Sequence, residues 1–351
     1  MPIELTGGGE ELEQELQREQ DSRGMRRQRM NSIGVDVGGT KIAAAVVTPE
    51  GKILNEVRYP TQAVPPNRLI ETIAEAIGEV KDGFEVGGVC LAVPGLILAS
   101  ENKVIFSPNL HEIEDIPLDK EMGSRTGLSV TVENDANAAA WGEFRYGAGK
   151  DVDHQIFITL GTGVGGGVIT HGLLLRGAQG AGGELGHVTI NATGPRCGCG
   201  NHGCLEALAS GTAIQRRARE VANEQPHSAL GRLAIDREVL GEDVTRLAQE
   251  GDEAAITVLQ ETGVWLGIGL AGFVNIFNPE VIVVGGGASR AGEFILGPAR
   301  KEVRLRARSP SRDLVEIKEA TLGPESGVLG AAALARGTDG EYVLGPSKRV
   351  A

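Results

Sequence analysis

The chain has 351 residues, a formal net charge of −13 and only 3% aromatic residues. This length can bury a large core and indicates two domains or one duplicated domain. The negative charge disfavours phosphate-rich nucleic acid as the main partner. The 52 glycines indicate tight turns and close approach of backbone to a ligand rather than collagen or disorder.

No apolar run reaches the roughly 18 residues that cross a bilayer, and no apolar signal segment opens the chain. Three of the four cysteines fall within residues 197–204, which is not a disulfide framework. Thiolate ligands suit a reducing compartment. We therefore expect a soluble, cytoplasmic protein that does not associate with membranes.

Residues 1–31 are rich in Glu, Gln and Arg and show almost no periodic apolar face. This composition predicts a solvated helix or a disordered tail. Met25 and Met30 lie just before the first expected strand, so a later natural start also fits. The segment is about half as long as a helix-turn-helix domain and lacks an apolar core, and we assign it no function.

The first ordered region is predicted to begin with three strands separated by turns. SIGVDV at 32–37, KIAAAVV at 41–47 and ILNEVRYP at 53–60 are rich in strand-forming residues, and GGTK forces the first turn. A helix is expected at 66–80, where proline stands at the start and apolar residues recur near a period of 3.6. A buried strand follows at 86–93.

A second strand-rich pattern repeats this order about 120 residues later. HQIFITL at 154–160 is a strand, GTGVGG a glycine turn, GGVIT at 166–170 a second strand and LLL at 173–175 the start of a third. The repeat of strand, Gly/Thr turn, strand, tight turn and strand predicts an internal duplication and two related domains facing each other.

Strands alternate with helices through the rest of the chain, which predicts the α/β class. Between the two copies, SVTVENDANAAAWGEFRYG is a strand that runs directly into a helix. Later helices are expected at 211–223 and 253–277, a buried strand at 281–287 and a last helix near Glu325. Cys90 stands alone in an apolar strand and is interpreted as a core residue.

Several glycine loops match nucleotide-binding patterns by letters but not by context. The GxGxxG run at Gly161 lies between two expected strands, and the one at Gly267 lies inside an apolar helical run. Neither opens a helix after a strand, as a dinucleotide fold requires. GVDVGGTK ends in Thr-Lys and precedes a strand, so it is not a Walker loop.

The two strand–turn–strand hairpins carry Gly and Thr at their tips. Exposed N–H groups and hydroxyls at such tips can cradle phosphate oxygens, although either hairpin alone also fits an ordinary turn. Duplication, and the presence of Asp36 and Lys41 in the first copy, favour phosphate binding. The VVGGG turn at 283–287 could accept a nucleobase or ribose by close backbone approach.

Asn134 and Asp135 stand where an expected strand ends and a helix begins, the usual ligand position in α/β sheets. Both residue types are also favoured helix N-caps, so capping alone explains them equally well. The functional hypothesis is that Asp135 accepts a proton from a substrate hydroxyl that Asn134 holds in place. Phosphoryl transfer then needs positioning, a metal ion and charge stabilisation.

The segment at 183–206, GELGHVTINATGPRCGCGNHGCLE, has the donor set of a tetrahedral zinc site. The candidate ligands are His187, Cys197, Cys199 and Cys204. A structural zinc is the simplest interpretation. Glu206 could merely stabilise a helix N-terminus, and Glu184 could be solvated surface.

Six motifs together resemble the ROK family of sugar kinases, especially its bacterial glucokinases. They are DVGGTK at 36–41, VPG at 93–95, ENDANAAAWGE at 133–143, LGTGVGGG at 160–167, ELGH at 184–187 and CGCGNHGCLE at 197–206. The resemblance covers residues 32–336 and implies an actin-like, ribonuclease-H-related fold with two lobes closing over a cleft.

The resemblance also implies a division of the chain. After the extension at 1–31, a small N-terminal lobe at 32–133 would be completed by a C-terminal helix at 325–337. A large lobe at 134–324 would contain the zinc-binding segment at 187–204.

The same resemblance implies roles at the matched positions, with Asp135 as the general base for the sugar 6-hydroxyl. Sugar would be bound by Gly95, Asn109, Asn134, Asp135, Glu184, His187 and Glu206. ATP phosphates and Mg²⁺ would be handled by Asp36, Gly38, Gly39, Thr40, Lys41, Gly161, Thr162 and Gly163. Adenosine would approach Gly285, Gly286 and Gly287, and zinc would be held by the four ligands named above.

The expected reaction is ATP-dependent phosphorylation of glucose at its 6-hydroxyl. Kinases of N-acetylglucosamine, N-acetylmannosamine, mannose or fructose would use the same motifs, and so would a sugar-sensing regulator without turnover or a zinc scaffold with an inactive cleft. The acidic balance and the short N-terminal segment argue against a regulator. Zinc would be structural, with His187 binding it through one ring nitrogen and the sugar through the other. The resemblance further implies a homodimer or homotetramer.

Overall fold

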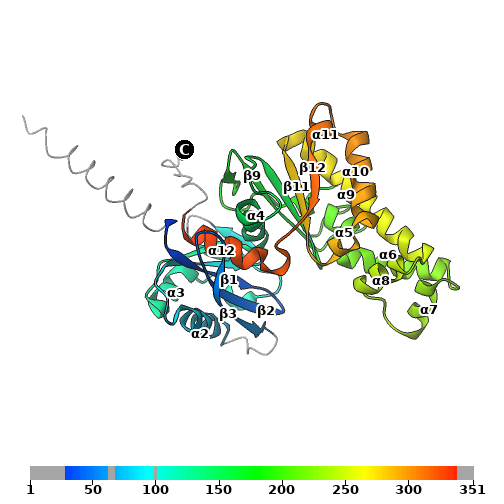
Figure 1. Cartoon of the computed structure of the whole chain (residues 1–351). Helices are drawn as coiled ribbons and strands as arrows, with labels where there is room; N and C mark the ends of the chain where they lie inside the picture. The colour runs from blue at the N-terminus through cyan, green and yellow to red at the C-terminus, as the bar shows by residue number, and fades with distance from the viewer. Residues whose placement is uncertain (1–27, 62–67, 99–100, 338–351) are drawn as a thin grey trace, which may run out of the picture.

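The computed structural model describes residues 28–61, 68–98 and 101–337, and two five-stranded sheets organise it (Figure 1). The first sheet has the order β3-β2-β1-β4-β7 and the second the order β10-β9-β8-β11-β12. The first contains β1 (Asn31–Val37), β2 (Lys41–Val47), β3 (Ile53–Pro60), β4 (Val86–Val93) and β7 (Val130–Asn134). The second contains β8 (Gln155–Leu160), β9 (Val164–Thr170), β10 (Leu173–Leu174), β11 (Val281–Gly285) and β12 (Glu316–Glu319).

The two sheets share one topology, which confirms the predicted duplication. In each, three consecutive strands pair antiparallel, and two later strands add in parallel on the other side of the first strand. The central strand β11 is buried on both faces, which explains why it reads as a continuous apolar run rather than as an alternating pattern.

Helices cover the faces of both sheets. Those of the first half are α2 (Leu69–Lys81) and α3 (Leu118–Thr126), and the small hairpin β5 (Leu96–Leu98) and β6 (Lys103–Phe106) follows β4. Those of the second half are α5 (Leu205–Ala209), α6 (Gly211–Glu224), α7 (Ala229–Asp236), α8 (Gly241–Gln249), α9 (Glu253–Phe277), α10 (Glu293–Arg306) and α11 (Ser311–Leu314). Two further helices, α4 (Asp135–Tyr146) and α12 (Ser326–Ala335), pack on each other. Short 3-10 turns are η3 (His111–Ile113), η4 (Leu185–His187), η5 (Gly287–Ala291) and η6 (Gly323–Glu325).

Most elements predicted from the sequence are present, with shifted ends. The helix expected at 66–80 is α2, which begins at Leu69, and residues 66–67 lie outside the described residues. The strand expected over 281–287 ends at Gly285, because Gly286 takes a positive φ of 88° that turns the backbone out of the sheet. The last helix begins at Ser326, directly after the 3-10 turn at 323–325.

Helix α9 is long and apolar enough to cross a membrane by length and composition alone. The expectation that no segment meets this criterion therefore does not hold for this helix. Its apolar residues belong to the core of the second lobe, where α9 packs on α10, α8 and α6. Core helices of soluble proteins pass the same test, so the finding is weak evidence for a membrane span.

The C-terminal helix α12 returns to the first sheet and lies between β1 and α4 (Figure 1). Glycines make this close approach possible. A Cβ atom at Gly34 of β1 would lie 1.9 Å from the carbonyl oxygen of Val328, and one at Gly330 of α12 would lie 1.7 Å from that of Ala138. Neither position can accept a side chain without movement of the backbone, so the last helix fixes the two halves of the chain against each other.

We expect Gly330→Ala to lower the free energy of unfolding by about 2–4 kcal/mol, because the added methyl group must separate α12 from α4. Urea denaturation would measure the change. Gly78→Ala is the matched control, since Gly78 lies in α2 with no atom within 4 Å of an added Cβ, and it should stabilise by roughly 0.5–1 kcal/mol. Equal stability of the two variants would contradict the role assigned to the α4–α12 contact.

Candidate functional site

The junction between β7 and α4 is both a helix cap and a candidate site. Asn134 Oδ1 accepts hydrogen bonds from the backbone N–H groups of Ala136 (2.9 Å) and Asn137 (3.0 Å), as an N-cap does. Its Nδ2 donates to the carbonyl oxygen of Gly95 at 3.1 Å. Asn134 therefore ties the turn after β4 to the start of α4, and Asp135 projects from the first helical residue beside it.

Asp135 has the electrostatics expected of a general base. Burial raises the pKa of its carboxyl above the usual value of 3.8, and the N–H groups of Ala136 and of Asp135 itself offset part of that rise. The bond from Ala136 N to Asp135 Oδ1 is 2.8 Å long. A carboxylate with a raised pKa accepts a proton more readily near neutral pH.

A cavity of about 70 Å³ opens beside this carboxylate. It is lined by Gly95, Leu96, Asn134, Asp135, Ala136, Asn137, Val164, Gly165, Gly166, Gly180, Gly182, Gly183, Glu184 and Leu185. Four of the residues predicted to bind sugar thus meet around one space. Partial burial raises the pKa of Glu184, as do the charges of Asp135 and Glu206, whereas His187 lowers it. All three groups therefore lie within electrostatic range of Glu184.

Glu206 links the second hairpin to the cysteine-rich segment. Its Oε2 accepts a hydrogen bond from Val164 N at 3.0 Å, and its Oε1 lies 3.4 Å from Cys197 Sγ. A Cβ atom at Gly163 would lie 2.3 Å from Glu206 Oε2, so a side chain there would displace this carboxylate from Val164 N. Glu206 contributes more than a charge at the start of the five-residue helix α5.

The predicted metal ligands converge on one point. The ligand atoms of His187, Cys197, Cys199 and Cys204 all lie within 4.8 Å of one another. Cys197 Sγ is 3.6 Å from His187 Nδ1, and Cys199 Sγ is 3.8 Å from Cys204 Sγ. Zinc–sulfur bonds of about 2.3 Å and a zinc–nitrogen bond of about 2.0 Å in a tetrahedron separate ligands by about 3.5–3.8 Å, so the cluster is compatible with zinc.

His187 presents its two ring nitrogens to different neighbours. Nδ1 faces the sulfur atoms, whereas Nε2 lies 4.0 Å from Glu184 Oε2. A metal bound at Nδ1 would fix the proton on Nε2 and direct that N–H toward the side of Glu184. His187 does not itself line the 70 Å³ cavity, so the sugar contact that the sequence predicts for its second nitrogen stays a prediction.

The first hairpin, between β1 and β2, has a tightly bonded tip. Gly38 N donates to Lys41 O at 2.8 Å, and Thr61 Oγ1 donates to Gly38 O at 2.7 Å. Gly39 and Thr40 are exposed. Asn109 lies beside this tip, since a Cβ atom at Gly39 would be 3.6 Å from Asn109 Cβ, and it does not line the 70 Å³ cavity.

Asp36, at the base of this hairpin, is a buried carboxylate close to a second one. Burial and the charge of Asp135 raise its pKa from 3.8 to about 6, while Lys41 lowers it in part. A Cβ atom at Gly327 of α12 would lie 3.1 Å from its Cγ. The base of the first hairpin and the start of α4 therefore bring two acids within electrostatic range of each other.

The second hairpin and the turn after β11 adjoin. Gly161 N donates to Gly163 O at 3.0 Å, and Thr212 Oγ1, in the first turn of α6, donates to Thr162 O at 2.8 Å. A Cβ atom at Gly286 would lie 2.5 Å from Leu160 N, which places the turn of Gly285, Gly286 and Gly287 against the end of β8. Backbone groups from three glycine-rich turns are therefore available for a polyanionic ligand.

Some residues of the cavity were not predicted from the sequence. Asn137 stands three residues after Asn134 on α4, and this helical spacing could have indicated it. Glycines at 180, 182 and 183 line the cavity through their backbones, and no letter pattern distinguishes them from other glycines in the chain.

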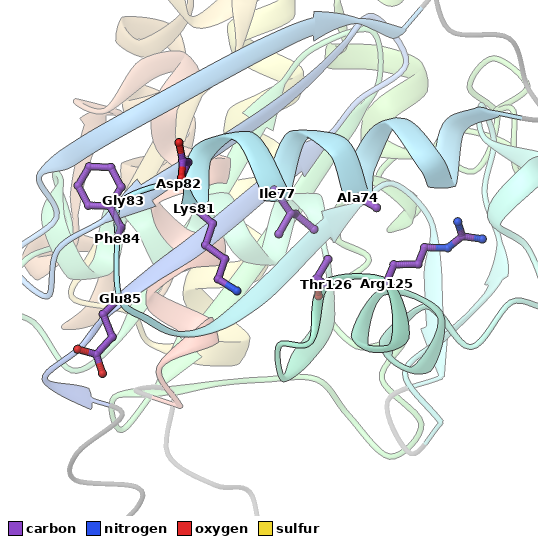
Figure 2. A pocket seen from close by; sticks show the side chains of 10 residues that line it. Ala74, Ile77, Lys81, Asp82, Gly83, Phe84, Glu85, Arg125 and Thr126 are labelled. Atoms are coloured by element: carbon purple, nitrogen blue, oxygen red, sulfur yellow. The ribbon is translucent and has the colours of Figure 1, made fainter.

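A groove of about 620 Å³ lies elsewhere, between α2 and α3 (Figure 2). Ala74, Ile77 and Lys81 line it from α2, and Arg125 and Thr126 from the end of α3. Arg125 pairs with Glu121 of its own helix. None of the site residues predicted from the sequence lines this groove, and its larger volume does not make it the functional site.

The chain belongs to the ROK family, whose model matches residues 32–338. Over 308 residues it is 42% identical to a glucokinase of Thermotoga maritima, which covers 87% of this chain and 97% of that protein. The structure of a ROK family glucokinase from Streptomyces griseus in complex with glucose and AMPPNP superposes with a TM-score of 0.76, at 40% identity, over 88% of this chain and 99% of that one. A xylose repressor of Bacillus subtilis is 32% identical over 86% of this chain and 76% of its own length. The family and the actin-like fold expected from the sequence are thus confirmed.

We expect Cys204→Ser to lose the metal and to lower the thermal midpoint, because three remaining ligands bind zinc weakly and the segment then loses its crosslink. The loss in free energy of unfolding should exceed about 2 kcal/mol. Metal analysis and differential scanning calorimetry would measure both. His202→Ala is the matched control, since His202 lies exposed in the same segment outside the ligand cluster. A metal-free protein with full stability would contradict the zinc assignment.

Asp36→Asn should stabilise the nucleotide-free protein in a pH-dependent way. A folded-state pKa of about 6, above the ordinary value of 3.8, means that protonation favours the fold. The stability contributed by Asp36 is fully present below about pH 4 and is lost as pH rises through 6. The variant should therefore gain up to roughly 3 kcal/mol above pH 7 and little at pH 4, as measured by urea denaturation. Asp82→Asn, at an exposed position, is the matched control, and a gain in Asp36→Asn that is uniform with pH would refute the mechanism.

Proposed function

We propose that this chain is an ATP-dependent glucokinase, which converts glucose and ATP to glucose 6-phosphate and ADP. The observation that carries the proposal is the buried Asp135 carboxylate at the start of α4, which lines a cavity shared with Gly95, Asn134 and Glu184. The similarity to glucokinases over nearly the whole of their length supports the same activity.

Asp135 removes the proton from the sugar 6-hydroxyl as that oxygen attacks the γ-phosphorus. Its raised pKa suits this role near neutral pH. Asn134 already uses its side-chain oxygen for the helix cap and one N–H for Gly95. One N–H of its amide remains to hold a sugar hydroxyl, and Glu184, His187 and Glu206 hold the others.

The glycine hairpins bind ATP on the other side of this carboxylate. Gly38, Gly39, Thr40 and Lys41 of the first hairpin and Gly161, Thr162 and Gly163 of the second supply N–H, hydroxyl and ammonium donors to the phosphates. Gly285, Gly286 and Gly287 approach the adenosine. Asp36 would hold Mg²⁺, because a buried carboxylate beside a second acid fits a divalent cation. When bound, the ion neutralises phosphate charge.

Zinc in this enzyme would be structural. Cys197, Cys199, Cys204 and His187 would hold it, and the crosslinked segment at 187–204 would then direct Glu184, His187 and Glu206 toward the sugar. Every protein ligand in the set of four is a Cys or His side chain, which is the composition of a closed structural site. The metal would supply structure to this segment and no chemistry at the phosphate.

The lobes close over sugar and ATP. We place the small lobe at 32–133 with the helix at 325–337, and the large lobe at 134–324. The packing of α12 on β1 supports this assignment. The net charge of −13 disfavours nucleic acid as a partner. We further propose that the enzyme works in the cytoplasm on small molecules, as a homodimer or homotetramer, without a membrane as partner.

A sugar-sensing regulator is the second candidate, because a xylose repressor shares 32% identity with the chain. A regulator needs a sugar pocket but no general base. The carboxylates of Asp36 and Asp135 lie close enough for the charge of Asp135 to raise the pKa of Asp36, which lowers the stability of the fold when both are ionised. Such unfavourable pairs of acids are typical of catalytic sites. This pair favours the kinase.

Asp135→Asn should lower kcat by roughly 10²- to 10⁴-fold while leaving sugar binding largely intact, because the amide cannot accept the hydroxyl proton. A coupled assay of ADP release over glucose, mannose, fructose, N-acetylglucosamine and N-acetylmannosamine would measure it, with Asp82→Asn as the control. Glucose should give the highest kcat/KM. Near-normal turnover by a folded Asp135→Asn protein would eliminate the assigned base, and an absence of sugar-dependent ADP release by the wild type would identify a sensor.

A further inference from the structure

The loop at 175–184 connects β10 to η4 and forms one wall of the 70 Å³ cavity. It ends in Glu184, and Gly180, Gly182 and Gly183 line the cavity. Its glycines at 177, 180 and 183 take positive φ values of 71°, 102° and 87°. So many glycines give the loop a high conformational entropy when it is not held, and its exposed Gln179 supplies no anchor.

Arg176 attaches this loop to the strand that leads to the catalytic base. Its Nε donates to Glu133 Oε2 at 2.6 Å, and Glu133 is only 6% exposed. Within the loop, Gly182 N donates to Arg176 O at 2.8 Å. Arg176 thus connects two parts of the loop through its backbone carbonyl, and its side chain connects the loop to Glu133 near the end of β7.

Glu133 passes the restraint on to the first turn of α4. Its second oxygen, Oε1, accepts hydrogen bonds from Asn134 N and from Asn137 Nδ2, each at 3.0 Å. Because Asn137 Nδ2 faces a carboxylate, the orientation of its amide is fixed. The carboxylate is therefore shared between the loop, the end of β7 and the helix that begins at Asp135.

Asn137 carries the network to the cavity wall. It is 2% exposed, and among the described residues its Oδ1 has no hydrogen-bond partner. A Cβ atom at Gly183 would lie 3.8 Å from this oxygen. The Asn137 amide thus presents a buried acceptor to the loop at Gly183, the residue that precedes Glu184. The loop and the first turn of α4 are therefore in contact at this point.

We propose that Arg176 is a positioning residue for the sugar, which acts through Glu133 and Asn137. The inference rests on the proposed sugar kinase function. The Arg176–Glu133 pair holds the loop at 175–184 against the first turn of α4, so that Glu184 and Asp135 address the same sugar. None of the hydrogen bonds described above for Arg176, Glu133 and Asn137 involves the residues proposed to bind ATP. Loss of the Arg176–Glu133 pair is therefore expected to act on the sugar side.

Arg176→Met should raise KM for glucose at least tenfold and change KM for ATP less than twofold. Arg176→Lys, which keeps the charge but lacks the Nε donor, should recover part of the loss. Glu133→Gln should raise KM for glucose at least as much, and the double variant Arg176→Met/Glu133→Gln should be no worse than Glu133→Gln alone, because the Arg176–Glu133 interaction is already lost in each single variant. Arg304→Met, at an exposed position on α10, is the matched control.

Glucose titration calorimetry without ATP, together with thermal midpoints, checks that each variant is folded and isolates sugar binding. An unchanged KM for glucose in folded Arg176→Met, an equal rise in both KM values, or additive effects in the double variant would overturn the inference. If the wild type itself releases no ADP with any sugar, the proposed function fails instead, so the two failures are distinguishable.

Discussion

The site depends on the contact of α12 with β1 and α4, because Asp36 lies on β1 and Asp135 on α4. Glycines allow the backbones of β1, α4 and α12 to approach one another, and a buried carboxylate binds the residues that precede α12. Glu143 of α4, which is fully buried, accepts hydrogen bonds from Leu322 N at 2.8 Å and Thr321 N at 3.2 Å. The last helix is thereby fixed to the helix that carries the proposed base, and the spacing of the two acids follows from backbone contacts rather than from flexible side chains.

A buried arginine strengthens the same junction at its other end. Arg336, which follows α12, is 2% exposed and donates hydrogen bonds to Ser32 of β1, to Val47 O of β2 and to Tyr146 at the end of α4. Burial lowers its pKa from the ordinary value. Removal of one partner from such a network leaves a buried polar group unsatisfied, so the junction resists change at the end remote from the cavity.

Local sequence patterns were sufficient to predict those elements whose signal lies within the element itself. The hairpins of both sheets, the strand–helix junction at Asp135, the long helix α9 and the zinc ligand spacing could all be predicted because period, turn chemistry and donor type lie within short windows. It failed where the signal is weak or contradictory. Helix α3 buries only Leu118 and Met122, α10 contains Pro298, and β12 has one buried residue at the sheet edge, so none of these elements was assigned.

The contacts that assemble the cavity were beyond prediction for a different reason. Glu133 and Arg176 are 43 positions apart, and neither belongs to a motif that specifies a partner, since charged residues usually mark solvated surface. Only the fold shows that Glu133 is buried and that a glycine-rich loop needs an anchor there. The resemblance to a family supplies the residues that touch substrate, whereas the residues that hold those groups in place emerge from burial and pairing in three dimensions. The proposed sugar site, with backbone glycines along its wall, requires such a support, because glycine has no side chain with which to fix its own position.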